Sequence, residues 1–204
     1  MKTAFEENLT KVNKVIDKAF NLVAKLFHKV HLSQRDIFDF IGLFMKAVVI
    51  TALLFTFVFR TVVVDGPSME NTLQNEDRLI VNQFFYEPHR GDIVVVTKDT
   101  KANGPIIKRV IAVAGDMIDI DFINGIVTVN GKELDEPYIK ETTRLQRDVK
   151  FPQTVEENCV FVMGDNRNNS HDSRALDVGM VELKYVMGKA IFRLSPFDKF
   201  GKIE

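Results

Sequence analysis

The feature that most constrains this chain is an apolar run from Ile41 to Phe59 that is interrupted by a single charge, Lys46. The run continues past Arg60 through three valines. A helix needs about 20 such residues to cross the hydrocarbon core of a bilayer, and this run offers no polar face of the kind that a surface helix shows. We therefore expect residues 37–64 to form a single transmembrane helix, with a buried core helix as the alternative.

The charges that flank this run predict its orientation. Lys25, Lys29 and Arg35 precede the run, and Lys46 lies near its N-terminal end. On the other side, acidic residues follow Arg60: Asp65, Glu70 and Glu76. Cytoplasmic flanks carry the excess of Lys and Arg, so we expect a single-pass protein of the cell membrane with a cytoplasmic N-terminus. A cleaved signal peptide is not expected, because the run begins too late and no small-residue cleavage site follows it.

Residues 1–36, upstream of the run, show an apolar stripe. Its members recur at intervals of three and four residues: Phe5, Leu9, Val12, Ile16, Phe20, Val23, Phe27 and Val30. The lysines lie largely off this stripe, which predicts a cytoplasmic amphipathic helix. Such a helix would lie on the inner membrane surface or pair with a partner helix. The charges are too dense for a second span.

Residues 65–204 are expected to form an extracytoplasmic, mainly β domain. Short runs rich in β-branched residues are bounded by turn residues, as strands are: Leu79–Val81, Ile93–Val96, Ile106–Ala114 and Cys159–Met163. No amphipathic run of helical length separates them, so parallel βαβ units are not expected. The pattern therefore predicts a mostly antiparallel sheet.

Two Asn-Gly pairs, Asn124-Gly125 and Asn130-Gly131, predict two-residue hairpin turns, because both central positions of such turns need positive φ. They frame residues 126–129 as a strand in a meander. The stretch from about 134 to 158 is polar and carries two prolines. We expect residues 117–158 to form a hairpin-containing excursion within the domain.

The composition narrows the classes of function. A net charge of -1 leaves no basic excess to neutralise a phosphate backbone, so nucleic acid is not an expected partner. Cys159 is the only cysteine, which excludes an intrachain disulfide. It stands in an apolar run and is expected to be a small core residue. The alternative, a thiol nucleophile, lacks a surrounding Cys/His motif.

Ser68 is the first candidate for chemistry and stands in the segment Gly-Pro-Ser-Met-Glu of residues 66–70. It could cap a helix, with its hydroxyl accepting a backbone N–H. A reactive serine needs a base instead. The segment lacks the second glycine of a nucleophile elbow, and Asn71 stands where a Ser-x-x-Lys motif has its lysine. His89 and His171 are alternative bases that nothing local orients.

Lys108, within the apolar run 105–116, is the better candidate for a base. Alternate residues of a strand share a face, which places Lys108 with Val110 and Ala112 and places Arg109 on the opposite face. Both faces are otherwise apolar, so at least one of the two cations is expected to be buried. Burial lowers the pKa of an ammonium by up to about 3–5 units, as a lysine requires in order to accept a proton near neutral pH. Arginine stays protonated, and Ser–Lys pairs are an established catalytic arrangement.

A dense polar loop, residues 163–174, follows the last of the predicted strands. It could be a surface loop tied by its own side-chain hydrogen bonds. A calcium loop is a second alternative, although Arg167 stands where alternating oxygen ligands are needed. The third is a set of side chains that fixes the catalytic base.

Four ordered segments together resemble the sequence boxes of bacterial type I signal peptidases. They are Gly-Pro-Ser-Met-Glu-Asn-Thr-Leu (66–73), Arg-Gly-Asp-Ile-Val-Val-Val (90–96), Ile-Lys-Arg-Val-Ile-Ala-Val-Ala-Gly-Asp (107–116) and Met-Gly-Asp-Asn-Arg-Asn-Asn-Ser-His-Asp-Ser-Arg (163–174). The resemblance extends through Gly-Lys-Ala at 188–190 and covers the whole outer domain. The glycine at position 66, the single span and the short outer domain resemble the Gram-positive branch.

The resemblance implies roles for individual residues. Ser68 and Lys108 would form a Ser/Lys dyad, and Ser170 matches the serine that hydrogen-bonds the lysine amine. Three further residues match polar groups that hold the site together: Asp165, Asp172 and Arg174. The Gram-negative pattern has an oxyanion-stabilising serine where this chain has Gly66. The backbone N–H of Ser68 would then supply one oxyanion donor, and the Gly66 N–H is a candidate for the second.

The function implied is that of a membrane-bound serine endopeptidase that removes signal peptides from exported preproteins after a small-x-small motif. Its expected partners are those preproteins and the lipid bilayer, and no metal or organic cofactor is required. Association with the secretion machinery stays open. One alternative is a self-cleaving repressor-type Ser/Lys protease, against which the membrane run and the absence of a DNA-reading domain argue. The other is a membrane-tethered β module that binds exported proteins without cutting them.

Overall fold

The computed structural model describes residues 14, 17, 18 and 21 and the ranges 34–57, 59–98 and 104–203. The chain divides into two compact units, Met1–Ala52 and Leu53–Glu204. The amphipathic helix predicted for residues 1–36 lies almost entirely outside the described residues.

Helix α2 (Gln34–Phe57) is followed by strand β1 (Phe59–Val63). Within the described ranges, no helix has both the length and the apolar character needed to cross a membrane. The predicted C-terminal boundary of the helix, residue 64, is wrong because the helix ends at Phe57 and β1 occupies residues 59–63. Thr61, Val62 and Val63 are β-branched, which favours a strand, and β1 pairs antiparallel with β2 (Arg78–Asn82).

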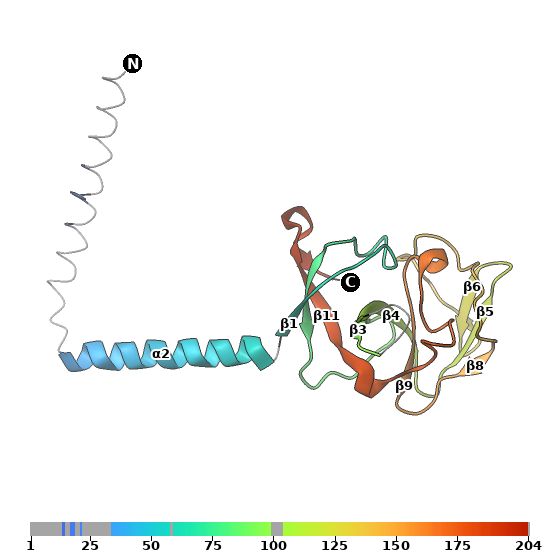
Figure 1. Cartoon of the computed structure of the whole chain (residues 1–204), viewed down its shortest axis with the longest axis horizontal. Coiled ribbons are helices and arrows are strands. Elements are labelled where there is room, and N and C mark those ends of the chain that lie inside the picture. The colour runs from blue at the N-terminus through green and yellow to red at the C-terminus, as the bar shows by residue number, and fades with distance from the viewer. Residues whose placement is uncertain are drawn as a thin grey trace, which may run out of the picture. The chain divides into compact units, whose positions relative to one another are not determined.

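The second unit contains two antiparallel sheets, which confirms the mainly β prediction (Figure 1). The larger sheet has the order β1-β2-β11-β3-β4-β9-β10, with β12 paired to β11. Its further strands are β3 (Ile93–Val96), β4 (Ile106–Val113), β9 (Cys159–Met163), β10 (Val181–Glu182), β11 (Val186–Ser195) and β12 (Gly201–Lys202). The smaller sheet has the order β7-β6-β5-β8, from β5 (Met117–Asp121), β6 (Ile126–Val129), β7 (Lys132–Glu133) and β8 (Gln153–Thr154). Short 3-10 helices are η1 (Arg167–Asn169), η2 (Leu183–Tyr185) and η3 (Phe197–Lys199).

The centre of the larger sheet is buried on both faces. Ile93 and Val95 of β3 pack in one apolar cluster, whereas Val94 and Val96 pack in another, as the alternation of strand side chains requires. Strand β4 lies between β3 and β9 in the sheet and is buried along nearly its whole length. Any cation on β4 therefore enters the protein interior.

The two sheets share an apolar cluster, to which β4 contributes Ile111 and Ala112 and the smaller sheet contributes Ile118 and Val127. The pairing of β4 with β9 shifts register between Val110 and Ala112. Strict alternation along β4, expected from the sequence, therefore breaks after Val110. The irregularity places adjacent residues 111 and 112 in the same cluster.

The two predicted hairpins differ. Asn130 and Gly131 have φ of 55° and 73° and join β6 to β7 directly, as predicted. The connection from β5 to β6 is instead a longer loop, residues 122–125, in which Gly125 but not Asn124 has positive φ. The two-residue turn predicted there is wrong, because the Gly125 N–H bonds the Asp121 carbonyl oxygen and the Asn124 side chain bonds the Asp121 carboxylate.

Candidate active site

Ser68 lies between β1 and β2 in a run of tight turns. The neighbouring side chains of Met69 and Leu73 are buried in the core and hold the segment, while Ser68 itself is half-buried. Residues 68–73 form turns and no helix. The alternative that Ser68 caps a helix is therefore wrong, and its hydroxyl is available for other contacts.

Lys108 on β4 meets Ser68. Its Nζ lies 2.8 Å from Ser68 Oγ and also donates to the Ile107 carbonyl oxygen at 2.9 Å. Lys108 is only 3% exposed. Burial lowers its pKa to about 8, against the opposing charges of Asp172 and Asp165 and with a small contribution from Arg174. An amine with this pKa is partly neutral near pH 8, so it can accept a proton from a hydroxyl at hydrogen-bond distance.

A cavity of about 200 Å³ opens beside this pair. Its apolar wall comes from the end of β1 and the residue after it, from the start of β4 and the residue before it, and from residues 66–73, the serine segment: Val63, Val64, Pro105, Ile106, Ile107 and Met69. Its polar wall is formed by Asp65, Ser68, Lys108 and His171.

The two histidines considered as alternative bases are engaged elsewhere. His171 lines the cavity, but its Nε2 lies 2.8 Å from Asp177 Oδ2. His89 is exposed, and its ring Nδ1 lies 3.8 Å from Asp92 Oδ2. The structure therefore brings Lys108, rather than a histidine, into hydrogen-bond contact with Ser68.

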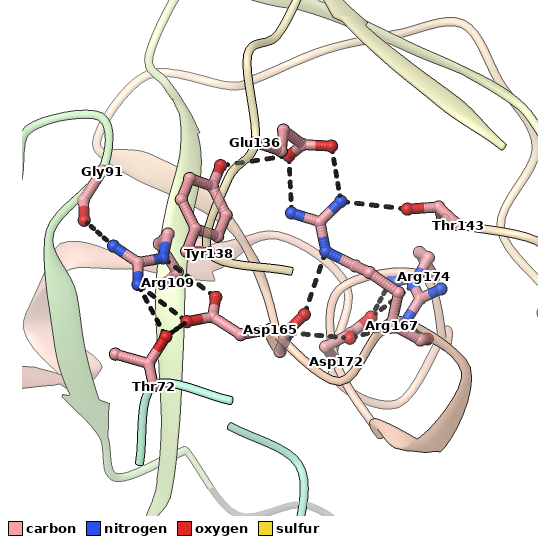
Figure 2. Close-up of polar contacts among 11 residues, drawn as sticks. Thr72, Gly91, Arg109, Glu136, Tyr138, Thr143, Asp165, Arg167, Asp172 and Arg174 are labelled. Atoms are coloured by element: carbon pink, nitrogen blue, oxygen red, sulfur yellow. Dashed lines mark hydrogen bonds and ion pairs between the residues drawn. The ribbon is translucent and has the colours of Figure 1, made fainter. Parts of the chain in front are cut away.

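Arg109, the neighbour of Lys108, is equally buried and binds Asp165 (Figure 2). Its Nε and Nη2 donate to the two carboxylate oxygens of Asp165 at 2.9 and 2.7 Å. Nη1 donates to the Gly91 carbonyl oxygen at 2.8 Å, and the Thr72 hydroxyl also donates to Asp165. A bidentate pair of this kind is strong and directional, so it ties β4 and the serine segment to the polar loop.

Asp172 and Arg174 form a second pair, which is completely buried. Arg174 Nε and Nη2 donate to the Asp172 carboxylate at 2.8 Å each, and Nη2 also donates to the Arg167 carbonyl oxygen. Burial raises the pKa of Asp172, but the hydrogen bonds and charge of Arg174, together with the nearby Ser170 hydroxyl and the Gly164 N–H, hold that pKa below its usual range. This anion lies close enough to act on the charge of Lys108.

Ser170 is buried close to the Ser68 backbone, but it does not form the bond to the lysine amine that the resemblance implied. A Cβ atom at Gly164 would lie 2.3 Å from Ser170 Oγ and 2.4 Å from the Ser68 carbonyl oxygen, so a glycine is needed for this close approach. Within the described residues, Ser170 Oγ has no hydrogen-bond partner of ordinary geometry. The predicted bond from Ser170 to the Lys108 amine is therefore not formed here.

Gly66 is placed differently from the expectation for an oxyanion donor. It has a φ of 86°, and its N–H donates to Asn75 Oδ1 at 2.8 Å. That donor is already used, so the suggestion that it forms the second oxyanion donor is wrong for this structure. The role of the Ser68 N–H as an oxyanion donor stays a prediction.

The structure adds residues to the site that sequence reasoning missed. The backbone N–H and side chain of Asn166 hold the carbonyl oxygens of Ser68 and Pro67, at 3.0 and 3.1 Å. Arg109 carried a local signal, because it is a second cation in an apolar strand. Glu136, which binds Arg167, carried none, because its stretch of sequence looks like an ordinary polar connection.

The other chemistries considered from the sequence find less support. The loop carboxylates Asp165 and Asp172 bind arginines, and no cluster of metal-binding residues exists in the described part of the chain. Cys159 is buried, and burial raises the pKa of its thiol. A thiol in this state is a poor nucleophile, which agrees with its expected place in the core.

Comparison with known proteins identifies the relatives of this site. The family described as signal peptidase, peptidase S26, matches residues 37–195. Signal peptidase I S of Bacillus subtilis (strain 168) is 35% identical over 83% of this chain and 95% of that protein. Signal peptidase I of Bacillus caldolyticus is 39% identical, covering 76% of this chain and 90% of that protein. A probable signal peptidase I-1 of Synechocystis sp. is 36% identical, covering 80% and 85%.

These matches confirm the resemblance first seen in four short segments, and the Bacillus relatives agree with its Gram-positive character. They extend well beyond those segments, through residues 37–195. The chain therefore belongs to the signal peptidase family, peptidase S26, and is a serine endopeptidase.

Proposed function

We propose that this chain removes N-terminal signal peptides from exported preproteins, with Ser68 as nucleophile and Lys108 as general base. The observation that carries the proposal is the 2.8 Å separation of Lys108 Nζ and Ser68 Oγ beside a cavity. The pKa of about 8 that burial gives Lys108 supports its role as base. The relatives' names, signal peptidase I, support the substrate class.

The reaction follows from this geometry. Neutral Lys108 takes the proton of the Ser68 hydroxyl as Oγ attacks the scissile carbonyl carbon, and the ammonium then protonates the amine that leaves as the C–N bond breaks. Lys108 next takes a proton from water, which attacks the acyl ester. Release of the new carboxyl terminus restores the Ser68 hydroxyl. The Ser68 N–H is proposed as oxyanion donor, a role whose loss typically costs about 10²–10³ in rate.

The supporting residues keep this pair in place. Asp165 holds Arg109 on β4, and Asp172 with Arg174 holds the polar loop on which Ser170 lies. Ser170 is proposed to bond the lysine amine once substrate occupies the cavity, since its hydroxyl is buried beside Ser68. Site residues of this kind act through geometry rather than by contact with the substrate.

The cavity supports cleavage after small residues. Its wall of Val63, Met69 and Ile106 suits apolar side chains, and its volume of about 200 Å³ has room for more than one small side chain. A preprotein cut after a small-x-small motif would place two such side chains near Ser68.

Membrane attachment belongs to the same proposal. The apolar run of residues 41–59 is long enough in sequence for a span, and apolar side chains along α2 are exposed, among them Leu43, Phe44, Val49 and Ile50. We propose a cytoplasmic N-terminus for residues 1–36, an anchor within residues 37–64 and an extracytoplasmic peptidase domain from residue 65. Lipid would cover the exposed side chains of the anchor, and the nucleophile would follow soon after it in the chain.

The test is cleavage of a preprotein with an Ala-x-Ala site by the full, detergent-solubilised chain. Ser68→Ala should be folded and inactive, whereas Ser195→Ala, a serine at the end of β11, should match the parent. Mass spectrometry of the products locates the cut. If Ser68→Ala cuts like the parent, the dyad is wrong, and if none of the three cuts, the non-cutting β module becomes the leading account.

A further inference from the structure

Residues 136–144, which we call the strap, connect the smaller sheet with every element that carries the proposed dyad. The strap follows β7 in the chain and precedes β8. Its side chains and backbone contact the polar loop, β4 and the serine segment. None of the four family-like segments of the sequence includes it.

The first contact is with Arg167 of the polar loop, whose side chain is completely buried (Figure 2). Its Nη1 and Nη2 donate to the two carboxylate oxygens of Glu136 at 2.9 and 2.6 Å, and Nη1 also donates to the Thr143 hydroxyl. Its Nε donates to the Gly164 carbonyl oxygen at 3.0 Å. The strap therefore fixes the loop at the glycine that packs against Ser68 and Ser170.

The second contact is with β4, next to the proposed base. The ring of Tyr138 lies 4.0 Å from the guanidinium carbon of Arg109, a cation–π arrangement. The Tyr138 hydroxyl donates to Glu136 at 3.0 Å, so the ring is held by the same carboxylate that holds Arg167. Arg109 directly follows Lys108, so the strap packs on β4 at the position next to the proposed base.

The third contact is with the serine segment. Lys140 Nζ lies 2.8 Å from the carboxylate of Glu70, two positions after Ser68, and the Asn71 side chain reaches the Ile139 carbonyl oxygen at 3.5 Å. The Lys140 backbone N–H donates to the Asp165 carbonyl oxygen at 3.1 Å. One residue of the strap therefore bonds both the serine segment and the polar loop.

We propose that the strap positions Ser68 against Lys108 and that Lys140 is a positioning residue that acts through Glu70. The inference rests on the proposed Ser68–Lys108 mechanism. Ser68 lies in turns, so the core contacts of Met69 and Leu73 fix its backbone on one side and the Lys140–Glu70 pair fixes it on the other. Proton transfer from Ser68 to Lys108 needs a close, aligned approach, and a small displacement of a reacting group lowers the reaction rate strongly.

The exposed Lys140–Glu70 pair allows a test that does not disturb the fold. Lys140→Met should lower kcat for cleavage of the Ala-x-Ala preprotein by about fivefold to tenfold, with KM within about twofold, because orientation rather than substrate contact is lost. The melting temperature should stay within about 2 °C of the parent value, since exposed ion pairs stabilise proteins little. The charge reversal Glu70→Lys/Lys140→Glu should recover most of the lost kcat, which a purely structural role would not predict.

Lys184→Met is the matched control, because it breaks a similarly exposed pair, Lys184 with Glu182, at 2.7 Å. It should leave kcat unchanged. A parent-like kcat for Lys140→Met, or a loss that the charge reversal does not recover, would overturn the strap proposal. Provided that Ser68→Ala is inactive in the same assay, either result leaves the proposed function standing.

Discussion

Four buried cations lie on β4 and in the polar loop, and the lysine among them has different hydrogen-bond partners from the three arginines. In the dyad, Lys108 is bonded to a hydroxyl and a carbonyl oxygen, and burial lowers its pKa to about 8. In the arginine network, Arg109, Arg167 and Arg174 are each bonded to a carboxylate. Burial opposes the charge of Arg167 as well, but the bonds and charge of Glu136 outweigh it and raise that pKa above its usual value.

The difference shows that burial alone does not make a base. A buried ammonium loses its proton more readily when its nearest partners are neutral than when a carboxylate is bonded to it, whereas a guanidinium stays protonated in either case. The two carboxylates whose charges raise the pKa of Lys108 are those of Asp172 and Asp165. Each of them is already bonded to an arginine, Arg174 and Arg109 respectively. The arginine network thus keeps the anions around the dyad engaged, and Lys108 has no bonded carboxylate.

The largest expected effect comes from giving the dyad a cation that cannot deprotonate. Lys108→Arg should lower kcat/KM for preprotein cleavage by about 10⁴-fold or more, because the guanidinium stays protonated. Lys108→Met should lose as much, and thermal unfolding followed by circular dichroism should show both variants folded. Retention of a substantial fraction of parent activity by folded Lys108→Arg would show that Lys108 is no general base.

The next effect comes from breaking the network. Arg174→Met leaves the Asp172 carboxylate buried without its partner, and the free energy of unfolding should fall by about 3–5 kcal/mol. Urea denaturation at neutral pH measures it. Arg90→Met, which removes a much more exposed partner from Asp116, should cost less than about 1 kcal/mol. Equal losses in the two variants would contradict the structural role given to the buried pair.

A smaller effect is expected when a network cation is exchanged for a lysine. Arg109→Lys keeps a charge beside Asp165 but loses the bidentate bond and the contact with Gly91, so stability should fall by about 1–3 kcal/mol. The carboxylate should keep this new ammonium protonated. The double variant Lys108→Met/Arg109→Lys should therefore stay inactive. Recovered cleavage would mean that a lysine at position 109 can act as the base, which contradicts the role that we assign to position 108.

Local patterns of the sequence predicted much of this fold. The β-branched runs at 93–96 and 159–163 are the strands β3 and β9 with unchanged bounds. The predicted end of the helix is too late, because the apolar run continues into β1 and hydropathy alone does not distinguish a helix from a strand. The two-residue turn predicted at residues 124–125 is wrong because hydrogen bonds to the Asp121 side chain and carbonyl oxygen shape the longer loop 122–125.

The site depended on a different kind of information. The apolar strand predicted that Lys108 or Arg109 would be buried, and both side chains are buried. The pairing of Lys108 with Ser68 came from the family resemblance, since the two lie 40 positions apart. Glu136 and Tyr138 were not foreseen, because their contacts depend on how the smaller sheet packs against the polar loop, which no local pattern encodes.

The most direct test of the Ser68–Lys108 dyad is the pH dependence of kcat/KM for the full, solubilised chain. Lys108 must be neutral to act as base, so activity should be low at acid pH, rise with pH and reach half its maximum near the pKa of about 8. Below that pH it should fall by about tenfold per unit. A profile that is flat through this region, in an enzyme shown to stay folded throughout, would contradict Lys108 as the general base.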